Sequence, residues 1–206
     1  MWRDEPVAIS APSSGIRGAH RKSRRGYCIC DMNYSEIKTC DIANGPGVRV
    51  TIFVSGCTHH CKGCFNEMTW DFAYGEPFTE QTIDTILSAL APDYIAGLTL
   101  LGGEPLEEEN RRALLPLLRA VKERFPSKSI WCYSGYLFER DIVEKFCVQW
   151  AQMEEFLSYL DVIVDGPFLL EQKDISLQFR GSRNQRIIRV RESLEQGKIV
   201  LWEDRI

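Results

Sequence analysis

Short apolar runs alternate with amphipathic stretches through most of this chain. Four runs are rich in β-branched and aromatic residues and end at a glycine or a serine–glycine pair, which predicts strands over 48–54, 97–101, 129–133 and 161–165. The stretches between them carry apolar residues at helical spacing, which predicts helices over about 79–90, about 109–125 and, in two pieces, 138–160. Strands that alternate with helices are typical of parallel βαβ units. Residues 32–206 are too few for an eight-unit barrel, which needs about 250 residues. We therefore expect an α/β fold with a mostly parallel sheet, an open or partial βα barrel.

Distinctive residues follow each predicted strand. A cysteine-rich loop follows the first strand, Gly102-Gly-Glu-Pro the second, Ser134-Gly the third and Gly166 the fourth. In parallel α/β folds, ligands bind at the edge where the strands end. We expect these four segments to meet in one site.

Three of the eight cysteines, Cys57, Cys61 and Cys64, lie within eight residues. Spacing this tight does not suit disulfides and is typical of a metal or a cluster. Two interpretations stay open. His59 or His60 completes a structural zinc site with four ligands, or the three thiolates hold a [4Fe–4S] cluster whose fourth iron is open. The second is favoured, because a histidine between such close ligands has difficulty folding back onto the same metal, and both histidines are then ordinary loop residues.

The remaining cysteines do not form a second motif. Cys132 and Cys147 fall inside a predicted strand and a predicted helix and are expected to be small buried residues. Cys40 has no close partner in the sequence, and Cys28 and Cys30 precede the predicted domain. This usage, without a signal-peptide core, indicates a reducing, cytoplasmic setting.

The first 31 residues differ from the rest in composition. They hold six Lys and Arg against three acidic residues, with several Pro, Gly and Ser and no apolar periodicity. We predict a flexible basic extension over 1–31 and a working domain over 32–206; a targeting peptide or a nucleic-acid patch at 20–25 are alternatives. The net charge of −4 gives no general reason to expect a nucleic-acid partner, and no apolar run is long enough for a membrane span.

Several motifs together resemble one family. The Cys-x₃-Cys-x₂-Cys loop followed by Gly-Gly-Glu-Pro resembles the radical S-adenosylmethionine (SAM) superfamily. Within it, the chain is similar over about 32–190 to the proteins that activate anaerobic ribonucleoside-triphosphate reductase, a group of glycyl-radical-enzyme activases. The matching segments are 41–47, 53–57, 61–66, 69–70, 130–131, 134–136, 164–166 and 180–185. Many other activases of glycyl-radical enzymes insert further cysteine-rich repeats, whereas this chain has no cysteine between 64 and 132.

The resemblance implies a mechanism. One [4Fe–4S] cluster per chain, held by the three loop cysteines, binds SAM through its open iron. An electron from a low-potential donor such as flavodoxin then cleaves SAM to a 5′-deoxyadenosyl radical, which takes a hydrogen atom from a backbone glycine of the reductase. No side-chain acid or base is required, and no nucleic acid or membrane takes part. The alternatives are a radical SAM enzyme that acts on a small molecule and a zinc-stabilised binding protein.

The resemblance also implies which residues contact SAM. We expect contacts from seven positions: Gly63, Cys64, Phe65, Gly102, Gly103, Glu104 and Ser134. The Glu104 carboxylate suits the ammonium group, the Phe65 ring is expected near the adenine, and Ser134 suits the carboxylate or the ribose. The structural alternatives are a tight turn at 102–105, core packing for Phe65 and a turn-forming role for Ser134.

Four further features have two interpretations each. Arg49 is a cation near the cluster or a strand-edge charge. Asp165 and the loop 180–182 face a peptide substrate or are simply solvated. The segment 44–47 is an ordinary turn or a loop over the site.

Overall fold

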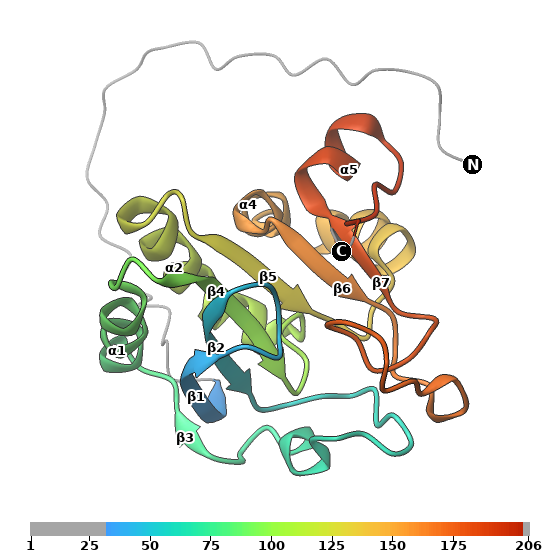
Figure 1. Ribbon diagram of the computed structural model, residues 1–206, viewed down its shortest axis with the longest axis horizontal. Coiled ribbons are helices and arrows are strands. Elements are labelled where there is room, and N and C mark those ends of the chain that lie inside the picture. Colours follow the sequence, from blue (N-terminus) through green and yellow to red (C-terminus); the bar gives the residue numbers. More distant parts are fainter. Residues whose placement is uncertain (1–31, 204–206) are drawn as a thin grey trace.

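The computed structural model describes residues 32–203. The predicted basic extension, with Cys28 and Cys30, lies outside the described residues. The described part is built on one seven-stranded sheet in the order β3-β1-β2-β4-β5-β6-β7 (Figure 1). The strands are β1 (Asn33–Asp41), β2 (Val48–Val54), β3 (Glu76–Pro77), β4 (Ile95–Gly102), β5 (Ser129–Tyr133), β6 (Val162–Asp165) and β7 (Arg186–Arg189).

The four predicted strands form the parallel centre of this sheet. β2, β4, β5 and β6 pair in parallel, whereas β1, β3 and β7 extend the sheet by antiparallel pairing. The edge strands β3 and β7 are not paired with each other, so the sheet is open. The predicted α/β class with an open sheet is confirmed, and the three antiparallel strands were not predicted.

Helices connect the parallel strands. They are α1 (Glu80–Leu90), α2 (Glu108–Arg124), the π-helical η3 (Phe138–Phe146), α3 (Cys147–Gln149) and α4 (Met153–Tyr159), and α5 (Val190–Gln196) follows β7. Thr79 and Thr82 cap the start of α1 reciprocally. Each crossover advances the strand order in the same direction, and right-handed crossovers then place the helices on one face of the sheet. None of the helices within 32–203 has the length and hydropathy of a membrane span.

The two faces of the sheet differ in chemistry because side chains alternate along each strand. Val50, Ile52 and Leu100 are fully buried in the main core beneath the helices, with Cys132 among them. Cys147 is only partly buried against the same core, so the prediction of a buried residue is confirmed for Cys132 and holds in part for Cys147. The opposite face carries a smaller cluster around Trp131.

Arg49 contradicts both sequence interpretations, because it is fully buried at the start of β2. Its Nε donates to Thr99 Oγ1 at 2.7 Å and its Nη2 to Leu98 O at 2.8 Å and Ser129 O at 2.9 Å. Burial lowers the pKa of Arg49 to about 10, which leaves it charged at neutral pH. The residue ties β2, β4 and β5 together at the edge where these strands begin.

The segment 44–47 lies at this same edge, because it comes directly before β2. The Asp41 carboxylate accepts from Ala43 N at 2.9 Å and Asn44 Nδ2 at 2.6 Å, which fixes the turn. The seven residues of β2 separate the turn from the cysteine loop by about 20 Å at 3.3 Å per residue. The turn interpretation is confirmed, and a loop over the site is wrong.

Candidate functional site

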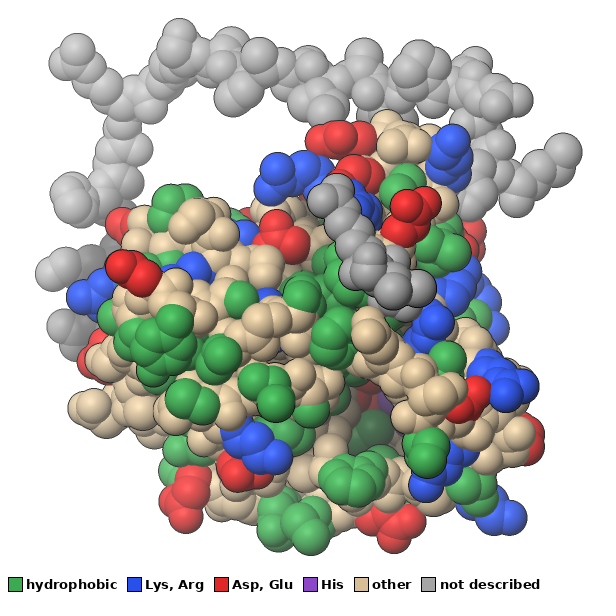
Figure 2. Space-filling view, viewed as in Figure 1, with side chains coloured by type: hydrophobic (Ala, Val, Ile, Leu, Met, Phe, Trp, Pro, Cys, Tyr) green, Lys and Arg blue, Asp and Glu red, His purple; other side chains and the backbone are tan. Residues whose placement is uncertain are grey.

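The parallel strands all end at one edge of the sheet. We call this edge the mouth; it is formed by the segments 55–66, 102–107, 134–137 and 166–170. In Figure 1 the arrowheads of β4, β5 and β6 point toward it. Figure 2 shows a hollow in the molecule in which a histidine side chain is visible. The prediction that the distinctive segments meet in one place is therefore confirmed for the described chain.

The cysteine loop starts as β2 ends. Cys57 is buried, while Cys61 and Cys64 are half-buried. The backbone N–H of Asn66 donates to the Cys64 sulfur at 3.4 Å. The backbone N–H groups of His59 and His60 near Cys57, and that of Phe168 near Cys61, act to lower the pKa of these two thiols. Hydrogen bonds to sulfur favour the thiolate, the form that binds metals.

Burial opposes that thiolate form. It raises the pKa of the Cys57 thiol to about 12 and also raises the pKa of Cys61, despite the N–H donors. A bound metal group supplies the positive charge that offsets this cost. The loop is thus suited to hold thiolates only together with such a group.

The described residues do not contain a four-ligand metal site. Within 32–203 no three Cys, His, Asp or Glu side chains converge as a formed metal site. The His59 ring contacts Glu104, and the His60 ring packs edge-to-face on Trp70 with centroids 4.7 Å apart. Both histidines are therefore engaged by other side chains, which does not favour the zinc alternative.

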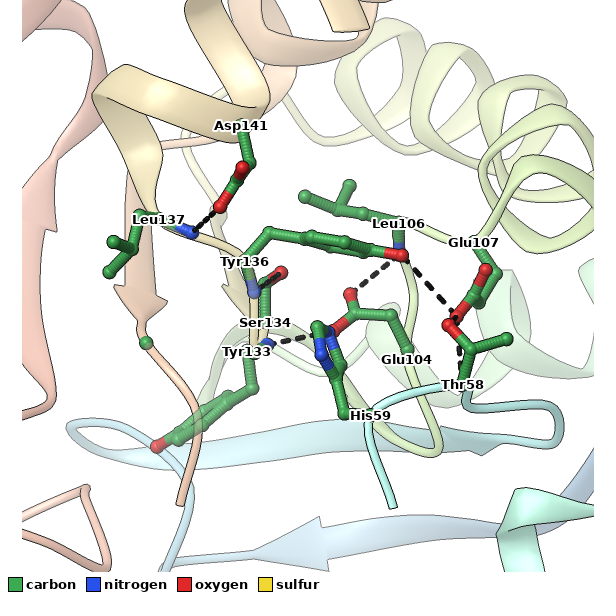
Figure 3. A network of polar contacts seen from close by, with 12 residues as sticks. Thr58, His59, Glu104, Leu106, Glu107, Tyr133, Ser134, Tyr136, Leu137 and Asp141 are labelled. Atoms are coloured by element: carbon green, nitrogen blue, oxygen red, sulfur yellow. Dashed lines mark hydrogen bonds and ion pairs between the residues drawn. The ribbon is translucent and has the colours of Figure 1, made fainter. Parts of the chain in front are cut away.

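Glu104 lies at the base of the mouth and is 1% exposed. Its Oε1 accepts from Leu106 N at 2.9 Å, and its Oε2 accepts from Gly135 N at 2.7 Å and contacts His59 Nε2 at 3.0 Å (Figure 3). The carboxylate is therefore held in one orientation by three separate segments. A fixed carboxylate of this kind is preorganised to receive a cation.

His59 has a role that the sequence interpretation missed. Its ring packs on Tyr136 with centroids 4.4 Å apart, and a Cβ added at Gly135 would lie 2.5 Å from it. Burial is the largest influence and lowers the pKa of His59, but the hydrogen bond and charge of Glu104 outweigh it, so the pKa is raised. Treating His59 as an ordinary loop residue was wrong, because it links the cysteine loop to Glu104.

Gly102 and Gly103 are needed for packing. A Cβ at Gly102, whose φ is 111°, would lie 2.5 Å from Val54 N, and one at Gly103 would lie 2.5 Å from Gly56 O. The Gly103 amide already donates to Val54 O at 2.7 Å. The tight-turn interpretation therefore has a physical basis, in which the two glycines let the end of β4 lie against the end of β2.

The other residues expected to contact SAM also lie at the mouth. The Phe65 ring is fully exposed, so the core-packing alternative is wrong. Gly63 has a φ of 74°, and a Cβ there would lie 3.1 Å from Leu170. Ser134 is buried, and its Oγ accepts a hydrogen bond from Tyr136 N at 3.1 Å. The hydroxyl hydrogen of Ser134 is therefore the group that can donate to a ligand.

Two residues that no motif pointed to hold the segments of the mouth together. The Glu107 carboxylate accepts from Thr58 N at 2.9 Å and from the Tyr136 hydroxyl at 3.4 Å (Figure 3). Asn110 is fully buried, and its Nδ2 donates to Ser55 O and Glu104 O, both at 2.9 Å. Neither residue belongs to a recognisable motif, so no sequence signal pointed to them.

Asp165 does not face a substrate. It is fully buried, and its carboxylate accepts from Phe138 N at 2.9 Å and Arg186 Nε at 3.0 Å. Ser182 in the loop 180–182 is also buried, and its Oγ accepts from Leu169 N at 3.2 Å. Both interpretations of Asp165 were wrong, because it is buried and bonded within the fold. In the loop 180–182 Ser182 is buried while Gly181 is exposed, so the solvated interpretation holds for only part of that loop.

Comparisons with known proteins identify the family. Residues 43–188 match the family described as a 4Fe-4S single cluster domain. The chain is 45% identical to a protein of Enterobacteria phage T4 over 158 residues, which are 76% of this chain and 93% of the phage protein. It is 43% identical to a Vibrio cholerae protein over 161 residues, with 77% and 98% covered. For an Escherichia coli K12 protein the identity is 40% over 156 residues, with 75% and 96% covered. All three are named anaerobic ribonucleoside-triphosphate reductase-activating protein. This chain, with its three-thiol loop, belongs to the family of anaerobic ribonucleoside-triphosphate reductase-activating proteins.

Proposed function

We propose that this chain is a radical SAM enzyme that creates the glycyl radical of an anaerobic ribonucleoside-triphosphate reductase. The observation that carries the proposal is that the three-cysteine loop and the fixed, buried carboxylate of Glu104 lie at one mouth of an open sheet, linked by His59. The names of the relatives described above support the reductase as the protein that is activated. In this proposal residues 32–206 form the activase domain, and the open sheet is a partial βα barrel of the radical SAM type.

Cys57, Cys61 and Cys64 would hold the cluster. The N–H donor at Cys64 and the N–H groups near Cys57 and Cys61 would stabilise the thiolates once iron offsets the cost of burial. When bound, the cluster supplies the electron that splits SAM into methionine and the 5′-deoxyadenosyl radical. The chain's own task is then to orient SAM and exclude water.

Glu104 would accept the ammonium group of SAM. Two backbone amides and His59 already fix its carboxylate, so little reorganisation accompanies binding. The Ser134 hydroxyl would donate to the carboxylate or the ribose, and the exposed Phe65 ring would cover the adenine. Gly63, Cys64, Gly102 and Gly103 would contribute contacts through backbone atoms other than the amides of Cys64 and Gly103, which are already bonded.

The partners follow from the same chemistry. The protein substrate would be the reductase, whose glycine has to reach the mouth. A low-potential donor such as flavodoxin would deliver the electron. We place the enzyme in the cytoplasm, a reducing setting in which the loop thiols stay available.

Anaerobic reconstitution with iron and sulfide, followed by dithionite and SAM, tests the proposal. We expect about four irons per chain and the release of methionine and 5′-deoxyadenosine. Cys57→Ala should lose both, while Cys40→Ala, at an exposed cysteine on β1, is the matched control and should keep both. Absent cleavage in the unaltered protein, or unchanged cleavage in Cys57→Ala, would refute the proposal.

Adding the reductase to the reconstituted protein distinguishes the activase hypothesis from that of an enzyme acting on a small molecule. The activase predicts a glycyl-radical doublet in the electron paramagnetic resonance (EPR) spectrum. Cleavage of SAM that depends on a small metabolite, with no reductase radical, would favour the alternative. A preparation that holds one zinc and no sulfide would favour the binding protein.

A further inference from the structure

The segment between β6 and β7 folds back on itself, and we call it the 166–185 hairpin. Its two arms, 166–174 and 181–185, are joined by an antiparallel β-bridge between Lys173 and Ser182. The second arm belongs to one of the segments that resemble the family, yet it has no part in the contacts proposed for SAM. Its role therefore has to be found in what it holds in place.

The first arm of the hairpin lies against the cysteine loop. A Cβ added at Gly63 would lie 3.1 Å from the side chain of Leu170, the first residue of η4 (Leu170–Gln172). Burial raises the pKa of the Cys61 thiol, and the backbone N–H of Phe168 is the largest influence that opposes it. In Figure 1 the orange segment after β6 runs beside the blue-green segment after β2. The first arm thus brings a backbone donor to one of the three thiols.

Ser182 connects the second arm to this donor. It is fully buried, and its Oγ accepts at 3.2 Å from the amide of Leu169, the neighbour of Phe168. Gln185 Oε1 lies 3.4 Å from the same Oγ, and it accepts from Gly181 N at 2.9 Å and Ser182 N at 3.1 Å. The Ser182 hydroxyl donates toward Gln185, which leaves a lone pair of its oxygen for the Leu169 amide.

Gln185 also fixes the other side of Phe168. Its Nε2 donates to Gly166 O at 3.2 Å, and the neighbouring Asn184 Nδ2 donates to Pro167 O at 2.7 Å. Side chains of the second arm therefore bind backbone groups directly before and directly after Phe168. The direction of the Phe168 N–H is set by these bonds.

We propose that Ser182 and Gln185 are positioning residues that hold the Phe168 N–H toward the sulfur of Cys61. This inference rests on the proposed function, because it concerns the cluster that Cys61 would help to hold. Hydrogen bonds to the sulfur atoms are among the features that set the reduction potential of an iron–sulfur cluster. An N–H group aimed at a ligand sulfur stabilises the more negative, reduced cluster. Without the two positioning residues, the cluster should be harder to reduce.

Potentiometric titration of the anaerobically reconstituted protein without SAM, followed by EPR, tests the inference. We expect Ser182→Ala and Gln185→Ala to shift the reduction potential to more negative values, with a change in the reduction equilibrium of about threefold to tenfold, the effect of one hydrogen bond. Ser182→Thr keeps the hydroxyl and should stay closer to the unaltered protein than Ser182→Ala does. Ser176→Ala is the matched control, because the exposed Ser176 hydroxyl bonds Asp174 in the turn of the same hairpin.

A second readout separates positioning from a purely structural role. Iron should pass to a chelator faster in Ser182→Ala and Gln185→Ala, whereas a structural role predicts a lower urea midpoint with an unchanged potential. An unchanged potential in both variants, or an equal shift in Ser176→Ala, would overturn the inference. Ser182→Ala removes a single oxygen atom, so it decides the question if Gln185→Ala does not fold. A shifted potential in a protein that does not cleave SAM would count against the proposed function alone.

Discussion

Asn110 provides a sharp test of how the mouth is assembled. Its buried amide, projecting from α2, connects the end of β2 with the turn that carries Glu104. Replacing it with alanine removes two hydrogen bonds of 2.9 Å, to Ser55 O and Glu104 O, and a longer one of 3.4 Å to Gly56 O. The backbone carbonyls then face a small cavity in place of a donor.

The loss of folding free energy can be worked out from those hydrogen bonds. Each of the two short bonds contributes about 1 kcal/mol net, and a carbonyl left unpaired in the interior adds about 1–3 kcal/mol. We expect Asn110→Ala to lower the free energy of unfolding by about 2–4 kcal/mol. The turn that carries Glu104 also loses its hydrogen bond to α2, so SAM should bind several-fold more weakly.

Urea denaturation of the apoprotein under anaerobic conditions measures the stability, and calorimetry of the reconstituted protein measures SAM affinity. Glu109→Ala is the control, because Glu109 is the exposed neighbour on the same helix. A stability loss below about 0.5 kcal/mol, equal to that of the control, would refute the assigned role of Asn110.

Three further predictions follow from the fold and the site. Arg49→Met should destabilise the protein by at least about 2 kcal/mol in urea denaturation, because Leu98 O and Ser129 O lose a buried donor; an unchanged midpoint would contradict the assigned role. His59→Ala should weaken SAM binding about fivefold, with iron content unchanged, because the Glu104 carboxylate loses one of its three hydrogen-bond partners. An affinity for SAM equal to that of the unaltered protein, or a loss of iron, would contradict this. Asp141 has its pKa held well below the ordinary value, chiefly by its hydrogen bond with Arg140. A lowered folded-state pKa stabilises the fold above the unfolded-state pKa, and this contribution is lost as the pH falls through the folded-state value. Asp141→Asn should therefore be less stable than the unaltered protein at pH 7, with the difference shrinking toward pH 2; a constant difference would argue against it.

The central strands and helices were predictable because each apolar run ends at a small residue. The predicted strand 97–101 is observed as β4, and the predicted helix 109–125 as α2. β1 was missed because its burial pattern is mostly half-buried to exposed, so it lacks a continuous apolar run. β7 has only four residues, with arginine at both ends, and gives little periodicity to recognise.

The location of the site could be predicted from the sequence, but the hydrogen bonds within it could not. Strand order brings the cysteine loop and the Glu104 turn to one edge, which follows from sequence pattern alone. The bond between His59 and Glu104 spans 45 residues, and that between Asn110 and Ser55 spans 55. Contacts over such separations depend on how α2 and the strand ends pack in three dimensions, and local sequence patterns do not specify that packing.

The most direct test of the account is EPR spectroscopy of the anaerobic reductase after incubation with the reconstituted protein, SAM and dithionite. The account predicts a glycyl-radical doublet that grows with the amount of activase, appears together with 5′-deoxyadenosine, and is absent with Cys57→Ala. A reductase that gains no radical, although the protein holds its cluster and cleaves SAM, would contradict the account.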